Sequence, residues 1–189
     1  MEHAMVDIVS RIQSNMDAMA FSCVFIDSKK AFDTVDHSIP IHKLDFYGFG
    51  GIINVWFRSY LQDRTQITVI DQRPSNKSVV MYGVPQGFVL VPLLFLLYVN
   101  DIYSSSRKLN FYLFAEDTNI LYSHKNLKAL VMKNVMNFEL NNVFQWLTLN
   151  KLTLNQSKSN FVIFHLYQKR LPFALTICIR DHQTNTLMY

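Results

Sequence analysis

The chain has 189 residues, of which 50% are hydrophobic and 14% aromatic, and it carries a formal net charge of +4. This composition excludes an intrinsically disordered chain, because disordered chains lack the apolar residues that form a core. The length suffices for one domain with its own core. The mild positive charge permits a polyanionic partner such as nucleic acid but does not require one.

Cysteine usage and hydropathy bear on the cellular setting. Cys23 and Cys178 each lie in an apolar run without metal-binding spacing, so we expect reduced, buried thiols, which suit an intracellular protein. The most apolar stretch, 88–99, contains Pro92 and is far shorter than the roughly 20 residues of a membrane span. The sequence therefore predicts no transmembrane segment and no signal peptide.

Helical periodicity marks the predicted helices, and short runs of apolar, β-branched and aromatic residues mark the strands. In chain order these are a helix over 1–17, a strand over 21–26, helices over 36–46 and 52–61, strands over 65–70 and 79–82, a helix over 88–102, strands over 109–114 and 118–122, a helix over 127–147 and a strand over 161–164. This order predicts an α+β fold with helices on one face of a mainly antiparallel sheet. The pattern weakens after residue 165, so we expect a domain over 1–165 and a short tail over 166–189.

Two acidic clusters indicate a metal site. Asp27 follows the predicted strand over 21–26, and Glu116 with Asp117 occupies the predicted tight turn of a later hairpin. Hard cations such as Mg²⁺ take oxygen ligands, and two such ions about 3.5–4 Å apart stabilise the attacking and leaving oxygens of a phosphoryl displacement. Carboxylates that converge from rigid elements thus point to two-metal nucleotidyl transfer.

Acidic residues at strand ends are also common as solvated turn residues. We favour that interpretation for Asp33 and Asp36, and Asp36 is well placed to serve as the N-cap of the following helix. The loop 83–87, Gly-Val-Pro-Gln-Gly, lies between the two acidic clusters. Its glycines permit close backbone approach to a ligand, and Gln86 can donate or accept hydrogen bonds. A loop of this kind on its own would be interpreted as a structural turn.

Four segments resemble the successive palm motifs of reverse transcriptases from non-LTR (LINE-type) retrotransposons. They are 25–37, 83–102, 114–119 and 150–164, in the family's order and approximate spacing, so the resemblance covers about residues 1–165. The resemblance implies the right-hand palm fold of a polymerase and RNA-directed DNA polymerase activity. It also implies an RNA template, a DNA primer, deoxynucleoside triphosphates and two Mg²⁺ ions, and a nuclear location because such elements copy into chromosomal DNA.

The resemblance further implies roles for individual residues. Asp27, Glu116 and Asp117 would be the catalytic metal ligands. Phe32 would be the steric gate that disfavours a ribose 2′-hydroxyl and so selects deoxynucleotides.

Two other segments would contact the substrates. Gln86 and Gly87 would lie against the incoming nucleotide and the template. Lys158 would lie near the triphosphate and assist pyrophosphate departure, the alternative being an ordinary surface lysine.

The sequence departs from the family at three motif positions. The family hairpin has aspartate where this chain has Glu116, and the added methylene matters because catalytic groups are held to within ~0.5 Å. A displacement near 1 Å costs on the order of 100-fold in rate. Phe88 replaces a serine, with loss of an N-cap at ~1 kcal/mol, and Val91 replaces a glycine, where overpacking costs ~1–3 kcal/mol.

The fingers strands, thumb and endonuclease of the family are expected to be incomplete or missing in these residues, which would weaken the grip on phosphates. Three interpretations therefore stay open. The first is a working palm, and the second is a degenerate palm of low or no activity, which Glu116 favours. The third is a catalytically inactive remnant that binds nucleic acid through basic and aromatic residues.

Overall fold

The computed structural model describes residues 2–16, 20–84, 90–114, 117–124, 129–164, 178–179, 182–183 and 185–188. The chain divides into two compact units. One unit comprises residues 1–29 and 100–189, and the other comprises residues 30–99.

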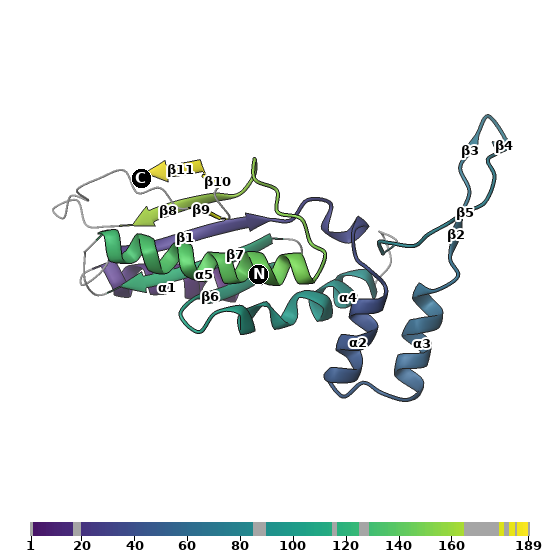
Figure 1. The fold of residues 1–189 in the computed structure, drawn as a ribbon, viewed down its shortest axis with the longest axis horizontal. Coiled ribbons are helices and arrows are strands. Elements are labelled where there is room, and N and C mark those ends of the chain that lie inside the picture. The colour runs from purple at the N-terminus through teal and green to yellow at the C-terminus, as the bar shows by residue number, and fades with distance from the viewer. Residues whose placement is uncertain are drawn as a thin grey trace. The chain divides into compact units, whose positions relative to one another are not determined.

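The first unit is built on a five-stranded sheet of order β11-β8-β1-β7-β6 (Figure 1). Its strands are β1 (Ala20–Asp27), β6 (Asn110–Phe114), β7 (Asp117–His124), β8 (Asn160–Phe164) and β11 (Asn185–Met188). The central strand β1 pairs antiparallel with β7 along its whole length and with β8 on its other side, and only β11 runs parallel to its neighbour. This arrangement confirms the predicted mixed fold with a mainly antiparallel sheet.

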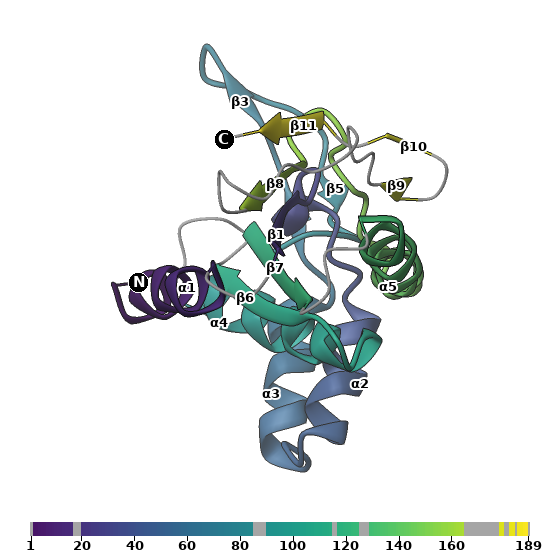
Figure 2. The same ribbon diagram turned by 90° about the vertical axis from the view of Figure 1, so that its left-hand side faces the viewer.

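Helices cover both faces of this sheet, whereas the sequence led us to expect helices on one face only (Figure 2). Helix α1 (Glu2–Met16) packs Ile8 and Ile12 against Cys23 and Leu121. Helix α5 (Ala129–Leu149) lies on the opposite side of the sheet (Figure 2). Burial on both faces explains why β1 reads as a nearly continuous apolar run without polar alternation.

Smaller elements complete the first unit. The 3-10 helix η2 (Asn100–Ser105) leads into β6, and β9 (Cys178–Ile179) pairs with β10 (His182–Gln183). Strand β11 lies within the predicted tail and adds to the sheet beside β8. The domain boundary expected at residue 165 stays a prediction.

A buried carboxylate ties the segment before β6 to α5. Glu139 on α5 is 5% exposed and accepts a hydrogen bond of 2.7 Å from Ser106 Oγ. Lys108 Nζ lies 3.4 Å from the same carboxylate group. Ser106 Oγ also accepts hydrogen bonds from the backbone N–H groups of Lys108 and Leu109. This network holds the start of β6, and through it the β6–β7 hairpin, against α5.

The second unit is mainly helical. It contains η1 (Ala31–Asp33), α2 (Ser38–Phe46), α3 (Ile52–Leu61) and α4 (Leu90–Val99), and α2 packs on both α3 and α4. A ribbon follows α3, formed by β2 (Thr65–Gln66) with β5 (Ser78–Val79) and by β3 (Val69–Ile70) with β4 (Arg73–Pro74). The ribbon turns at Asp71 and Gln72, which have φ of 49° and 64°.

Several sequence-based expectations need correction in detail. The strands expected over 65–70 and 79–82 are broken into shorter pairs, and residues 73–74 and 78, which lie between the expected strands, take part in the pairing. The helix expected over 88–102 ends at Val99 and continues as a 3-10 helix. Residues 85–89 lie outside the described part of the chain.

Asp36 also differs from its prediction. The side chain is buried rather than solvated, and the cap position of α2 is His37. Asp36 Oδ1 nevertheless accepts a 2.9 Å hydrogen bond from the N–H of Ser38 and a bond from its hydroxyl. The carboxylate therefore does stabilise the start of α2, from one residue before the cap, whereas Asp33 is exposed as expected.

Two other expectations concern thiols and membranes. Cys23 is buried, and burial raises the pKa of its thiol to about 12. Within the described residues, no helix is both long and apolar enough to cross a membrane.

Candidate active site

The site begins where β1 ends and β7 starts. Asp27 and Asp117 are direct partners in the antiparallel register of the two strands. Directly opposed residues of an antiparallel pair project from the same face, with Cβ atoms about 4.5–5.5 Å apart. The fold therefore brings together two predicted carboxylates from segments far apart in sequence, with Asp27 half-buried and Asp117 exposed.

The hairpin that carries Asp117 closes tightly. Phe114, the last residue of β6, pairs with Asp117, the first residue of β7. Glu116, the third predicted metal ligand, lies outside the described residues, and so do Gln86 and Gly87 of the predicted nucleotide loop.

A loop after α5 holds Asp27 in place. Asn155 makes two bonds to it: its backbone N–H donates to Asp27 O at 2.9 Å, and its side-chain Nδ2 donates to Asp27 Oδ2 at 2.7 Å. The Ser159 hydroxyl accepts from the N–H of Asp27 at 3.3 Å and donates to Asn155 O at 2.8 Å. Both the backbone and one carboxylate oxygen of Asp27 are thus fixed by this loop.

The same loop extends the pairing beyond the end of β1. Ser28 forms an antiparallel bridge with Leu154, and Lys29 N–H donates to Thr153 O at 2.8 Å. Lys158 lies in a turn closed by its N–H to Asn155 O at 3.2 Å, and its side chain is exposed. The turn that contains Lys158 therefore begins at Asn155, the residue that is hydrogen-bonded to Asp27.

The donor set at this edge suits a divalent cation. Mg²⁺ prefers oxygen ligands and is usually held by one or two carboxylates together with substrate phosphates. Asp27 and Asp117 supply carboxylates on one face, and Asp27 Oδ1 has no hydrogen-bond partner among the described residues. The described part of the chain contains no cluster of three or more His, Cys, Asp or Glu side chains able to hold a metal.

The predicted steric gate lies in the second unit. Phe32 is in η1, and its ring lies 4.7 Å from that of Phe95, centroid to centroid. The backbone carbonyl of Phe32 accepts a 2.9 Å hydrogen bond from Val84 N–H. The first part of the predicted nucleotide loop is therefore bonded directly to the residue expected to sense the sugar.

Gly83 strengthens this attachment. Its N–H donates to Val35 O at 2.8 Å, and its carbonyl lies 2.7 Å from His37 Nε2. Because a carbonyl only accepts, this contact requires the proton on Nε2 of His37. Gly83 has φ of +84°, and a Cβ atom at this position would lie 2.8 Å from Asp33 O. Only glycine fits here without a shift of the backbone.

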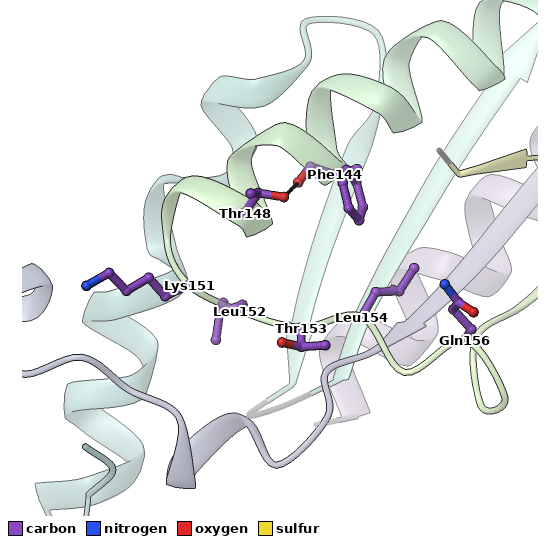
Figure 3. Close-up of a pocket in the computed structure, with 7 residues that line it drawn as sticks. All are labelled: Phe144, Thr148, Lys151, Leu152, Thr153, Leu154 and Gln156. Carbon is purple, nitrogen blue, oxygen red and sulfur yellow. Dashed lines mark hydrogen bonds between the residues drawn. The ribbon is translucent and has the colours of Figure 1, made fainter. Parts of the chain in front are cut away.

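A cavity of about 330 Å³ lies between the C-terminal part of α5 and the loop that follows it (Figure 3). Its lining residues are Phe144, Thr148, Lys151, Leu152, Thr153, Leu154 and Gln156. Of the predicted site residues that the structure describes, Asp27, Phe32, Asp117 and Lys158, none lines it. Thr148 Oγ1 donates to Phe144 O at 2.9 Å, a bond within the helix.

The sequence did not reveal every residue that shapes the site. Asn155, Ser159 and His37 bond to Asp27 or to the nucleotide loop, yet none was assigned a role. The run of Asn and Ser around Asn155 predicts a turn. Its contact with a residue 128 positions earlier has no sequence signal.

Comparison with known proteins identifies the relatives of this chain. The family described as reverse transcriptase (RNA-dependent DNA polymerase) matches residues 3–187. A probable RNA-directed DNA polymerase from transposon BS of Drosophila melanogaster is 31% identical over 139 residues, which is 64% of this chain and 15% of that protein. The corresponding protein of transposon X-element, also of Drosophila melanogaster, is 28% identical over 173 residues, 87% of this chain and 18% of that protein. The chain thus spans less than a fifth of the length of these relatives.

A solved structure supports the same fold. Telomerase from Candida tropicalis, in complex with a fragment of telomeric RNA, superposes with a TM-score of 0.60 at 12% sequence identity. The similarity covers 85% of this chain and 29% of the telomerase chain. At this identity the similarity speaks for the fold alone.

Proposed function

Because this chain belongs to the reverse transcriptase family and is the reverse transcriptase domain of a retrotransposon, we propose that it holds a polymerase palm site for RNA-directed DNA synthesis. The reaction would add deoxynucleotides to the 3′ end of a DNA primer on an RNA template. The observation that carries the proposal is the direct pairing of Asp27 with Asp117 at the shared end of β1 and β7.

Divalent metal ions are used by reverse transcriptases generally, and the donor set of this site fits them. Asp27 and Asp117, with Glu116, would hold two Mg²⁺ ions. When bound, such ions stabilise the attacking and leaving oxygens of an in-line displacement at phosphorus. Asp27 is suited to this task because its backbone and one carboxylate oxygen are already fixed.

The other predicted residues would orient the nucleotide. Phe32 would lie beside the sugar and exclude a 2′-hydroxyl, and its contact with the tilted ring of Phe95 limits its rotation. Gln86 and Gly87 would contact the incoming base and the template. Lys158 would neutralise charge on the departing pyrophosphate, and its exposed side chain is available for that role.

Glu116 is expected to reduce the turnover of this chain. Its side chain is one methylene longer than the aspartate usual in the family, and a ligand displaced by about 1 Å lowers rate on the order of 100-fold. We therefore propose a palm of low or no activity that retains metal binding. A catalytically inactive remnant that still binds nucleic acid is the second candidate, supported by the basic net charge.

Primer extension on an RNA template tests the proposal. The native chain is assayed with Mg²⁺ and then with Mn²⁺, beside Glu116→Asp and an Asp27→Ala control. We expect weak extension that rises sharply in Glu116→Asp and disappears in Asp27→Ala. Folded protein that shows no extension in either the native or the repaired form would refute polymerase activity for this chain. Salt-sensitive binding of single-stranded RNA in that case would identify the inactive remnant.

A further inference from the structure

Asn155 bonds directly to a predicted metal ligand. Its Nδ2 donates to Oδ2 of Asp27 at 2.7 Å, and both residues are half-buried. From this contact we propose that Asn155 is a positioning residue, which holds the carboxylate of Asp27 through Oδ2 and leaves Oδ1 available to a metal ion. The inference rests on the proposed function, because it assigns Asp27 the role of metal ligand.

The orientation of the Asn155 amide is determined at both of its ends. An ionised carboxylate can only accept hydrogen bonds, so the NH₂ group must face Asp27. On the other side, Asn155 Oδ1 accepts a 2.9 Å hydrogen bond from the hydroxyl of Ser157. The two contacts require the same orientation of the amide, so the donor to Asp27 is fixed.

The hydrogen bond from Asn155 to Asp27 is expected to affect metal binding by Asp27. Oδ2 of Asp27 is occupied by Asn155, while Oδ1 has no hydrogen-bond partner among the described residues. An unrestrained aspartate would populate several side-chain rotamers, of which only some present an oxygen to the metal. Residues that orient metal ligands in this way typically contribute 10–100-fold to metal affinity or activity, as an order of magnitude.

The backbone contacts of the loop do not depend on the Asn155 side chain. Asn155 N–H bonds to Asp27 O, and Asn155 O accepts from Ser159 N–H at 2.9 Å and from the Ser159 hydroxyl at 2.8 Å. These bonds survive truncation of the side chain. Substitution at residue 155 therefore tests the amide contact while the loop stays attached to β1.

The test compares Mn²⁺ binding, followed by electron paramagnetic resonance, in the native chain, Asn155→Ala and Ser157→Ala. Ser157→Ala is the matched control, because it lies in the same turn and touches Asn155 but does not contact the Asp27 side chain. We expect Asn155→Ala to weaken Mn²⁺ binding by about 10–100-fold. The control should change it by less than about threefold, as expected for a residue one contact further away.

Two additions keep the result interpretable. Asn155→Ser retains a turn-forming polar residue whose side chain is too short to reach Asp27, so it replaces Asn155→Ala if the alanine variant does not fold. Asp27→Ala establishes that the measured ion sits on Asp27. Native Mn²⁺ affinity in a folded residue-155 variant would overturn the inference. Absence of Mn²⁺ binding in the native chain, or binding that Asp27→Ala leaves unchanged, would do the same.

The Asn155 inference and the polymerase proposal are tested by different measurements, Mn²⁺ binding and primer extension, so one can be refuted without the other. Weakened Mn²⁺ binding in the Asn155 variants of a chain that never extends a primer would support the inference and refute the polymerase function. Primer extension that persists with unchanged Mn²⁺ affinity in Asn155→Ala would refute the inference and leave the polymerase function intact.

Discussion

Gly83 and Gly48 form a natural pair for measuring what a close backbone contact contributes at the start of the nucleotide loop. Their φ angles are nearly the same, +84° and +85°. A Cβ added at Gly48 would meet no heavy atom within 4 Å, whereas one added at Gly83 would lie 2.8 Å from Asp33 O and 3.0 Å from Asp33 Cα. Alanine at the two positions therefore shares the conformational penalty and differs in the steric one.

The expected magnitudes follow from these two terms. An L-residue in the left-handed region costs about 1–2 kcal/mol, which should be the whole effect of Gly48→Ala. Gly83→Ala adds a backbone clash that no side-chain rotation can relieve, and overpacking of this kind costs ~1–3 kcal/mol. We therefore expect Gly83→Ala to lower the free energy of unfolding by about 2–5 kcal/mol. The shift should also stretch the hydrogen bond that Gly83 N–H donates to Val35 O and the one that Gly83 O accepts from His37 Nε2.

Urea unfolding of both variants, followed by circular dichroism and tryptophan fluorescence, measures the difference. A difference below about 0.5 kcal/mol between Gly83→Ala and Gly48→Ala would refute the steric argument, because surface substitutions vary by that much. If Gly83→Ala folds in a shifted backbone, primer extension should fall more than it does in Gly48→Ala, since Gly83 leads directly into the loop that carries Gln86.

Three further predictions concern the first unit. Ser106→Ala removes a hydrogen bond to the buried carboxylate of Glu139 and should lower the free energy of unfolding by about 1.5–3 kcal/mol. An equal loss of unfolding free energy in Ser104→Ala, whose hydroxyl makes an exposed hydrogen bond, would contradict this. Burial, the main cause, and the hydrogen bond to Asp7 on α1, the second, raise the pKa of Tyr112 from 10.0 to about 12. Its contribution to stability is therefore full below pH 10 and lost as pH rises through about 12. Tyr112→Phe should lack this fall in the free energy of unfolding between pH 10 and about 12, as measured by urea unfolding against pH; the same fall in the variant would contradict the assignment. Cys23, with a thiol pKa near 12, should resist disulfide reagents in the folded chain and react once the chain unfolds. The measurement uses a variant whose other cysteine is serine, and rapid reaction of the folded variant would show that the Cys23 thiol is accessible to the reagent.

The elements with a strong local signal could be predicted from the sequence. Helix α3 begins and ends where the apolar periodicity predicted, at Ile52 and Leu61. Strand β1 was predicted because its composition suits a strand buried on both faces. The ribbon was misjudged because Asp71 and Gln72 adopt positive φ, and Gln72 in that conformation has no strong sequence signal.

Only some residues of the candidate site could be predicted from the sequence. The acidic residue types and their positions at strand ends pointed to Asp27 and Asp117, and the register of β1 with β7 is consistent with a shared site. The burial of Asp36 was not expected, because its pairing with Tyr82 depends on a bridge between distant segments. Asn155 was not predicted for the same reason, because its role depends on a side-chain contact with Asp27, which is distant in sequence.

The central position of β1 has a consequence for the order in which the molecule assembles. Strand β1 leaves the ribosome before its partner strand β7, which follows only after roughly 90 further residues, about 5–20 s later at ~5–20 residues per second. During that interval the second unit, residues 30–99, is complete and can collapse, while β1 has neither β7 nor β8 beside it. Such long-range pairing slows folding and leaves an apolar strand open to wrong partners. The yield of folded chain should therefore respond to translation speed and to chaperones that shield exposed strands.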